Sequence, residues 1–338
     1  MSAAHVPLPP GGPPHAVAAG VDRWVTAEPV RDLVHAFGGR WPAGGTGALL
    51  HWLDEFTARH WDFRAGRERH EAAEPDLHPH VADRVLAAAR ALGMVHAARA
   101  PRRTYRHLLV LGGLAHACVR RAGYAAHLLR AGVEVTGEVA VLGSFRPLGP
   151  AERRTLADAG IHGCRTEVDA LDQGVRTAFA PVTLVDQAGH TGADPHASWS
   201  VRSYRTADDT TVRVLAAPSG EPAVRRAHTA DTQRFWAGRV TLSAADRVLM
   251  VTAPIYVPFQ HCDALRTLAL PYGCGIDTIG VDPTLDLGPL PEPTLTPGRY
   301  LQEVRSAVRA MRALHAELVD HHRSTRQRAT GCEEPTRG

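Results

Sequence analysis

The feature that most constrains the fold is a series of short apolar runs that alternate with helical patterns between residues 106 and 282. The first run, residues 107–111 (HLLVL), ends in Gly112-Gly113, which is typical of a strand buried on both faces. A helical pattern and a second apolar run, residues 138–143, follow it. Strand–helix–strand units of this length predict an α/β protein with a mainly parallel sheet covered on both faces.

The rest of this region continues the alternation. Further strands are expected at residues 182–185, 212–217, 247–252 and 276–281, and helices at 114–130, 151–159, 166–179 and 227–237. Residues 186–197 are rich in Gly, His, Asp and Pro and predict a loop, whereas the alternating residues 199–206 predict an antiparallel addition to the sheet. Two prolines after residue 252 predict a loop there as well.

Five segments are expected along the chain. They are a disordered tail (1–26), a helical prelude packed on the core (27–105), the α/β domain (106–282), a Pro-rich connector with a C-terminal helix (283–324) and a second disordered tail (325–338). The prelude and the C-terminal helix both have apolar residues at helical spacing.

Composition excludes several classes of protein. The 338 residues are 44% hydrophobic and 22% charged, and no apolar stretch is long enough to span a membrane. All 38 basic residues are arginine, so lysine chemistry of the Schiff-base or P-loop type is excluded. The net charge of +3 gives no reason to expect DNA as a partner, and five scattered cysteines suit a reducing cytoplasm. No spacing predicts a metal site.

Polar residues follow four of the expected strands, and the carboxyl ends of parallel strands meet at one edge of a sheet. At the first end, Gly112 and Gly113 would let an anion approach backbone amides, although a tight turn without a ligand explains them equally well. At the second end, Ser144 and Arg146 form a candidate anion site. Glu167 lies at the next helix start, where simple capping is the alternative interpretation.

The other two strand ends complete the candidate site. The third has the densest polar cluster in the chain, although Thr229 there also suits a helix cap; the candidates are Ser219, Arg225, Arg226, Thr229 and Asp231. The fourth offers hydrogen-bonding groups from Thr252, Tyr256 and Gln260.

The order of these strand ends resembles the family that includes YdcF, SanA and ElyC. The matching residues are Leu111-Gly112-Gly113, Arg120 or Arg121, Leu142-Gly143-Ser144, Glu167, Thr229-Ala230-Asp231-Thr232 and Val251-Thr252-Ala253. The resemblance covers residues 106–282 and implies a Rossmann-like three-layer sandwich. It also implies a phosphate-bearing or nucleotide ligand, such as S-adenosylmethionine. The family's Glu-Asn pair is replaced by Asp231-Thr232, and its His-x-x-Arg by residues 256–260.

A second resemblance concerns the third and fourth strand ends. The Ala-Pro-Ser to Arg-Arg-Ala block at residues 217–227, with Tyr-Val-Pro-Phe-Gln at 256–260, is similar to arginine-type cyclodipeptide synthases. It implies aminoacyl-tRNA as a partner, with Glu167 or Asp169 recognising an arginine side chain.

These observations predict a soluble cytoplasmic enzyme that binds an anionic or nucleotide-containing small molecule and transfers a group. Arg146 and Arg226 would hold the anion, and Glu167 and Asp231 would serve as general acid or base. The alternatives are an aminoacyl-tRNA-dependent cyclodipeptide synthase and a ligand-binding protein without catalysis.

Overall fold

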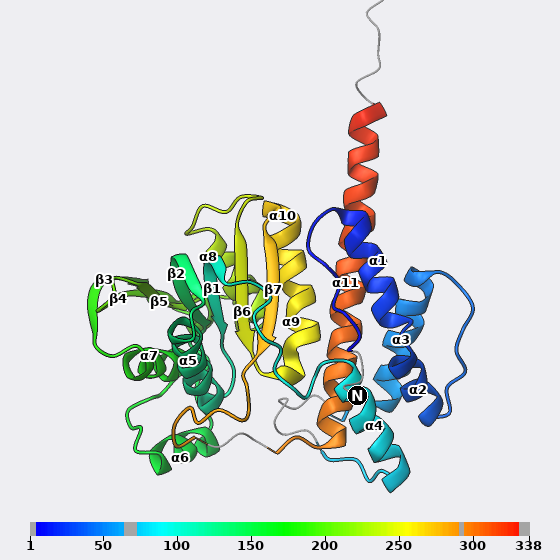
Figure 1. The fold of residues 1–338 in the computed structure, drawn as a ribbon, viewed down its shortest axis with the longest axis horizontal. Coiled ribbons are helices and arrows are strands. Elements are labelled where there is room, and N and C mark those ends of the chain that lie inside the picture. Colours follow the sequence, from blue (N-terminus) through cyan, green and yellow to red (C-terminus); the bar gives the residue numbers. More distant parts are fainter. Residues whose placement is uncertain (1–4, 64–72, 291–293, 331–338) are drawn as a thin grey trace, which may run out of the picture. The chain divides into compact units, whose positions relative to one another are not determined.

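The chain divides into two compact units, residues 93–295 and residues 1–92 with 296–338, which are described separately (Figure 1). The computed structural model describes residues 5–63, 73–290 and 294–330, with side chains as far as residue 321. Within this part of the chain, no helix combines the length and the apolar character that a membrane span requires.

The unit of residues 93–295 is built on a seven-stranded sheet in the order β3-β4-β5-β2-β1-β6-β7. The strands are β1 (Thr104–Leu111), β2 (Glu134–Gly143), β3 (Val182–His190), β4 (Trp199–Thr206), β5 (Thr211–Ala216), β6 (Arg247–Thr252) and β7 (Gly275–Gly280). Five neighbouring strands, from β5 to β7, run parallel. The predicted α/β class with a mainly parallel sheet and flanking helices is therefore confirmed.

The two remaining strands form an antiparallel addition at one edge of the sheet. The addition predicted for residues 199–206 is confirmed, because β4 pairs antiparallel with both β3 and β5. The loop predicted for residues 186–197 is wrong in its first part, since β3 continues to His190. Backbone pairing with β4, such as Asp186 with Ser203, holds those polar residues in the strand.

Helices cover both faces of the sheet. On one face, Leu108 and Val110 of β1 share a core with Ala122 of α5 (Ala115–Arg130) and Leu171 of α7 (Glu167–Ala178). Side chains alternate along a strand, so Met250 of β6 faces the other way. Met250 contacts Gln233 of α8 (Thr229–Ala237), and α8 packs with α9 (Val257–Ala264) on this second face. A further short helix, α6 (Pro150–Asp158), follows β2.

The loop predicted after β6 is a series of helical turns. A short 3₁₀ turn (Pro254–Tyr256) leads into α9, and the helix continues through a π-helical segment (Leu265–Ala269) and α10 (Leu270–Tyr272) to Gly273. The two prolines that suggested a loop are Pro254, which begins the 3₁₀ turn, and Pro258, which lies in the first turn of α9. At both positions the missing backbone N–H needs no partner.

The second unit is helical. It contains α1 (Pro14–Val25), α2 (Glu28–Ala36), α3 (Thr46–His60), α4 (Pro79–Ala91) and α11 (Pro297–Thr330). The disordered tail predicted for residues 1–26 is wrong over the described residues 5–26, because Val17, Val21 and Trp24 of α1 are buried in this unit; residues 1–4 lie outside the described residues. Pro14 occupies the first turn of α1, so the proline-rich start of the chain initiates a helix.

The C-terminal helix belongs to this helical unit, and so the expected segment of residues 283–324 is divided between the two units. On α3, Asp54 pairs with Arg305 (3.8 Å), Arg309 (4.0 Å) and Arg312 of α11. The helix runs to Thr330, beyond the expected start of a tail at residue 325, and residues 331–338 lie outside the described residues.

Candidate functional site

The carboxyl ends of the parallel strands bring the predicted site residues to one edge of the sheet. The chain leaves β1 toward β2 and β5 on one side, whereas β6 and β7 lie on the other side of β1. Open sheets bind ligands where the strand order reverses in this way. The reversal falls between β1 and β6, whereas the polar side chains that meet come from the turns after β1, β2 and β5, and these turns define the candidate site.

A buried carboxyl group, that of Glu167, lies at the centre of this edge. Ser144 donates to its Oε2 from both the hydroxyl (2.7 Å) and the backbone N–H (3.1 Å). Burial raises the pKa of Glu167, and the opposing effects of Arg146, Ser144 and Arg226 are smaller. The capping role belongs to its neighbours, because Thr166 is the N-cap of α7 and accepts from the N–H of Asp169 (3.4 Å). The Glu167 side chain is therefore not needed to cap α7.

The two glycines after β1 leave space that protein side chains fill. A Cβ at Gly112 would lie 2.5 Å from Oε1 of Glu167, and one at Gly113 would lie 3.2 Å from Nη1 of Arg121. Arg121 is buried and donates to the carbonyl of Leu111 (2.7 Å). The close approach that glycine permits here is made by Glu167 and Arg121.

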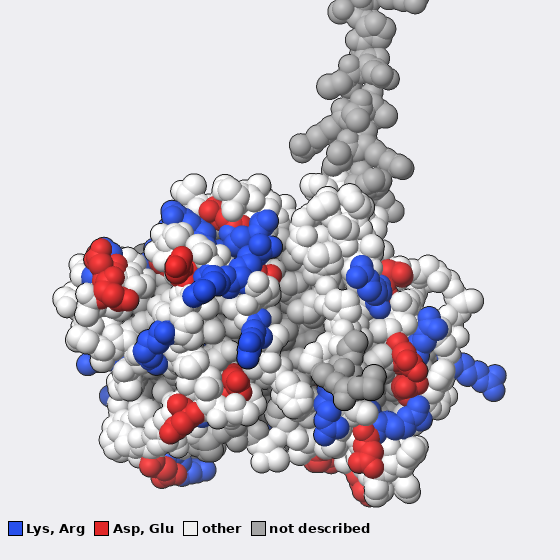
Figure 2. All heavy atoms as spheres, viewed as in Figure 1, with Lys and Arg blue, Asp and Glu red and all other residues white. Residues whose placement is uncertain are grey.

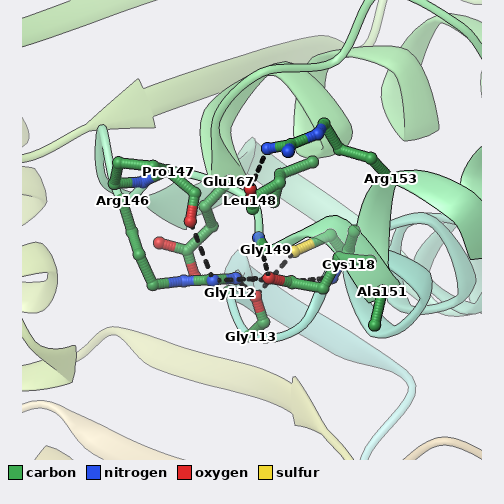
Figure 3. Close-up of polar contacts among 12 residues, drawn as sticks. Gly112, Gly113, Cys118, Arg146, Pro147, Leu148, Gly149, Ala151, Arg153 and Glu167 are labelled. Carbon is green, nitrogen blue, oxygen red and sulfur yellow. Dashed lines mark hydrogen bonds and ion pairs between the residues drawn. The ribbon is translucent and has the colours of Figure 1, made fainter. Parts of the chain in front are cut away.

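Arg146 is held in an ion pair, which corrects the expectation that it clamps a ligand anion. Its two Nη atoms donate to the two carboxylate oxygens of Glu152, each at 2.8 Å, and Nη2 also donates to the Gly113 carbonyl at 2.8 Å. The Arg146 side chain in Figure 3 reaches across to Gly113, beside Glu167. The fork of the guanidinium is therefore used within the protein, where it ties the turns after β1 and β2 together.

A small cavity adjoins this ion pair. Its volume is about 10 Å³, room for roughly one water molecule. Ser144, Arg146 and Arg226, three of the predicted ligand-binding residues, line it together with Phe145, Pro195, His196, Ala217 and Ala227.

The third strand end forms a separate cluster at the start of α8. Arg225 donates to both carboxylate oxygens of Asp231 (2.5 and 3.3 Å), and the N–H of His228 donates to the same carboxylate at 2.9 Å. Burial would raise the pKa of Asp231, but Arg225 and His228 hold it below its usual value. An ionised, paired carboxylate is poorly suited to the predicted general acid or base role.

The neighbouring candidates also have local partners. The N-cap of α8 is His228, so Thr229 is the first helical residue, and its carbonyl accepts from the Thr232 hydroxyl (2.9 Å). Ser219 accepts from the N–H of Glu221 (3.0 Å). The Ser219 hydroxyl thus has a partner within its own turn, and the contact of Thr229 is made by its backbone.

The fourth strand end is not part of the cavity lining. Thr252 is fully buried and Gln260 is 5% exposed, and Thr252 Oγ1 and Gln260 Oε1 have no hydrogen-bond partner among the described residues. Tyr256 is connected to the first strand end, because the Arg121 guanidinium lies 5.8 Å from the centre of its ring.

Sequence reasoning missed the partners that fix this edge. Glu152 lies in the first turn of α6 and accepts from the N–H of Gly149 (2.9 Å), a position that suits a helix start and gives no indication of a pair with Arg146. The resemblance to the YdcF-type family pointed to Arg120 or Arg121, but it did not indicate that Arg121 fills the space beside Gly113. His196, in the segment expected to be a loop, was not chosen.

Thiol and metal chemistry have little support at this edge. Burial raises the pKa of Cys118 to about 12, and it also raises the pKa of Cys262, so both thiols stay protonated at neutral pH. Across the described ranges, no three His, Cys, Asp or Glu side chains converge in a way that could hold a metal ion.

Comparison with known proteins places the chain in a family. Residues 9–93 match the family model described as the Rv3785 N-terminal domain, a stretch that includes α1 to α4. The uncharacterized protein Rv3785 of Mycobacterium tuberculosis is 35% identical over 343 residues, which cover 91% of this chain and 92% of the relative. The uncharacterized protein Mb3814 of Mycobacterium bovis matches to the same extent.

The chain therefore belongs to the Rv3785 family, and the match extends over both of its units. No solved structure matches it.

Proposed function

We propose that residues 93–295 form a Rossmann-like, three-layer enzyme domain that binds an anionic small molecule at the carboxyl edge of its sheet and transfers a group. The observation that carries the proposal is the position of Glu167. Its buried carboxyl group is held by Ser144 (2.7 Å) beside a cavity that Arg146 and Arg226 line. Proton donors and cationic side chains at one strand-end site suit the transfer of an anionic group.

Glu167 is the proposed general acid. Because burial raises its pKa, the carboxyl group keeps its proton to a higher pH than an exposed glutamate does. Ser144 fixes Oε2, and the absence of a side chain at Gly112 makes room for Oε1. An oriented, protonated carboxyl group can give its proton to a leaving group as the bond to that group breaks.

Arg226 is the proposed anion-binding residue, and Arg146 is a positioning residue. Both arginines act electrostatically on Glu167, but the two Nη atoms of Arg146 are engaged by Glu152. Arg226 belongs to the segment of residues 217–228, which contains no helix or strand. A ligand larger than a water molecule requires this segment to move outward.

S-adenosylmethionine, or another nucleotide, does not fit the residues present. A cofactor that lay against the glycine turn would overlap Glu167 and Arg121, which fill the space beside Gly112 and Gly113. The adjoining cavity holds about one water. We therefore propose a compact anionic substrate and assign no nucleotide cofactor.

The test combines binding with turnover. Calorimetry against inorganic phosphate and a panel of small phosphorylated and carboxylate metabolites should detect a binding event at the carboxyl edge, and Arg226→Ala should abolish that event. Arg165→Ala, which removes an exposed arginine outside the cavity, should bind normally. Unchanged affinity in Arg226→Ala would remove this residue from the site.

Turnover separates the proposed enzyme from the alternatives. Mass spectrometry should show conversion of the bound metabolite by the wild-type chain and at least about 100-fold slower conversion by Glu167→Gln. Binding without conversion would favour a ligand-binding protein. Cyclic dipeptides in the medium of an expressing culture would favour a cyclodipeptide synthase.

A further inference from the structure

A second and larger cavity lies at the opposite, amino edge of the same sheet. Its volume is about 460 Å³, and its lining includes Arg106, His107, Gly137, Glu138, Arg213 and Arg239. These residues come from the first parts of β1, β2 and β5 and from the segment after α8. In Figure 2, basic side chains gather at the upper end of the α/β unit, where Figure 1 places the starts of these strands.

The charges that line this cavity are not balanced. Arg213 pairs with Glu138 (2.5 Å), whose Oε1 also accepts from Trp236 Nε1 (2.8 Å). Arg106 and Arg239 donate only to backbone carbonyls, those of Thr136 (3.2 Å) and Phe235 (2.9 Å). Neither has a carboxylate partner among the residues that the structure describes, so two guanidinium charges face the cavity without compensation.

The pKa of Arg239 is consistent with excess positive charge here. Burial lowers it, and repulsion from Arg213 lowers it further. An anion bound between these guanidinium groups would relieve that repulsion. Arg239 also lies against the aromatic rings of Phe235 and Trp199, which hold its side chain in place.

A buried histidine lies in the wall of the same cavity. His107 is 4% exposed and lines the cavity, yet neither of its ring nitrogens has a hydrogen-bond partner within the described ranges. Its ring packs edge-on against Trp236, with ring centres 5.2 Å apart. Gly137 makes this placement possible, because a Cβ there would lie 2.8 Å from His107 Cε1.

An unpaired polar ring is costly in a protein interior. Burial lowers the pKa of His107, so the ring is neutral at pH 7 and has one N–H to donate and one nitrogen that accepts. Both ring nitrogens are shielded from solvent, so an anion in the cavity would act on the ring through its charge and not through a direct hydrogen bond.

We propose that this amino-edge cavity is a binding site for a small molecule that carries a phosphate group. Two uncompensated guanidinium groups match the charge and the oxygen geometry of a phosphate dianion. The volume of about 460 Å³ falls in the range of small-molecule sites, so it accommodates more than the phosphate itself. The inference does not depend on the activity proposed for the carboxyl edge.

Calorimetry on the full-length chain with inorganic phosphate as the probe tests this site, with sodium chloride at equal ionic strength as the reference. Arg106→Gln and Arg239→Gln should each weaken phosphate binding at this cavity about tenfold or more, and the double variant should abolish that binding event. Both arginines are exposed, so circular dichroism should show an unchanged fold.

Two matched controls identify the site that is measured. Arg154→Gln removes an exposed arginine on α6, at the other edge of the sheet, and should bind phosphate normally. Arg226→Ala should leave the amino-edge event intact, because Arg226 lines the carboxyl-edge cavity. Loss of all binding in Arg226→Ala, with normal binding in the Arg106/Arg239 double variant, would overturn the proposal.

Nuclear magnetic resonance provides a readout on the wild-type chain. Phosphate, but not chloride, should shift the ring ¹⁵N resonances of His107, and Arg239→Lys should retain part of the shift because it keeps the charge. Ring resonances that respond to neither anion at saturating phosphate would also overturn the proposal.

Discussion

A methyl group added to Gly112 would lie 2.5 Å from Oε1 of Glu167 and 2.8 Å from the carbonyl oxygen of Leu142. Neither neighbour can move easily, because Ser144 holds Glu167 and Leu142 is in β2. We expect Gly112→Ala to reduce the free energy of unfolding by about 1–3 kcal/mol. Urea denaturation followed by circular dichroism measures this. Gly113→Ala, which meets the end of the Arg121 side chain at 3.2 Å, is the matched control and should cost less.

The pH dependence of stability should report the buried Glu167 carboxyl group. Its pKa is raised in the folded state, so the folded protein binds this proton more tightly than the unfolded chain does. This contribution to stability is present below the ordinary glutamate pKa and is lost as the pH rises through the folded-state value. Glu167→Gln should remove this loss. The measurement is the melting temperature of both proteins at pH values from 4 to 9. A difference between wild type and variant that stayed constant with pH would contradict the assignment.

The other carboxylate at this edge should show the opposite dependence. Burial alone would raise the pKa of Glu152, but hydrogen bonds from Arg146, Gly149 and Ala115 lower it to about 2 from its ordinary 4.5. Its stabilising contribution is therefore present above pH 4.5 and lost as the pH falls toward 2. Glu152→Gln should cost about 3 kcal/mol at pH 7 and little at pH 2, as measured by urea denaturation at both values.

A double-mutant cycle tests whether Arg146 acts through Glu152. Arg146→Met leaves the Glu152 charge buried and should cost about 3–5 kcal/mol. Because the two side chains share the same bonds, Arg146→Met combined with Glu152→Gln should cost clearly less than the sum of the single variants. Additive costs, measured by urea denaturation, would show that the ion pair has no energetic role.

Much of the fold could be predicted because burial on both faces leaves a continuous apolar run. The strand expected at residues 247–252 coincides with β6, and the antiparallel strand was evident from its alternation. Two of the errors arose where prolines were interpreted as breaks. At Pro14 and Pro258 they lie in the first turn of a helix, and only tertiary packing distinguishes the two cases.

The position of the candidate site could be predicted from the sequence, but the contacts that each of its side chains makes could not. Strand ends must meet at one edge, so Gly112, Ser144 and Glu167 were expected together and lie in contact. The pairing of Arg146 with Glu152 depends on the path of a turn, which no local pattern encodes. His107 was hidden because it begins an otherwise apolar run, where its unpaired ring nitrogens leave no trace in the sequence.

Asp231 should act on stability instead of catalysis. Its carboxylate accepts from Arg225 (2.5 Å) and from the N–H of His228 (2.9 Å). Asp231→Asn should therefore destabilise the protein by about 1–2 kcal/mol at pH 7. Because these bonds lower the pKa of Asp231, the difference from wild type should shrink as the pH falls below the ordinary value of 3.8.

Glu221→Gln is the control, because its exposed contact with Arg225 (3.6 Å) is worth less than about 1 kcal/mol. A variant protein with Asp231→Asn that was as stable as wild type but no longer converted the bound metabolite would show that Asp231 is a general acid or base.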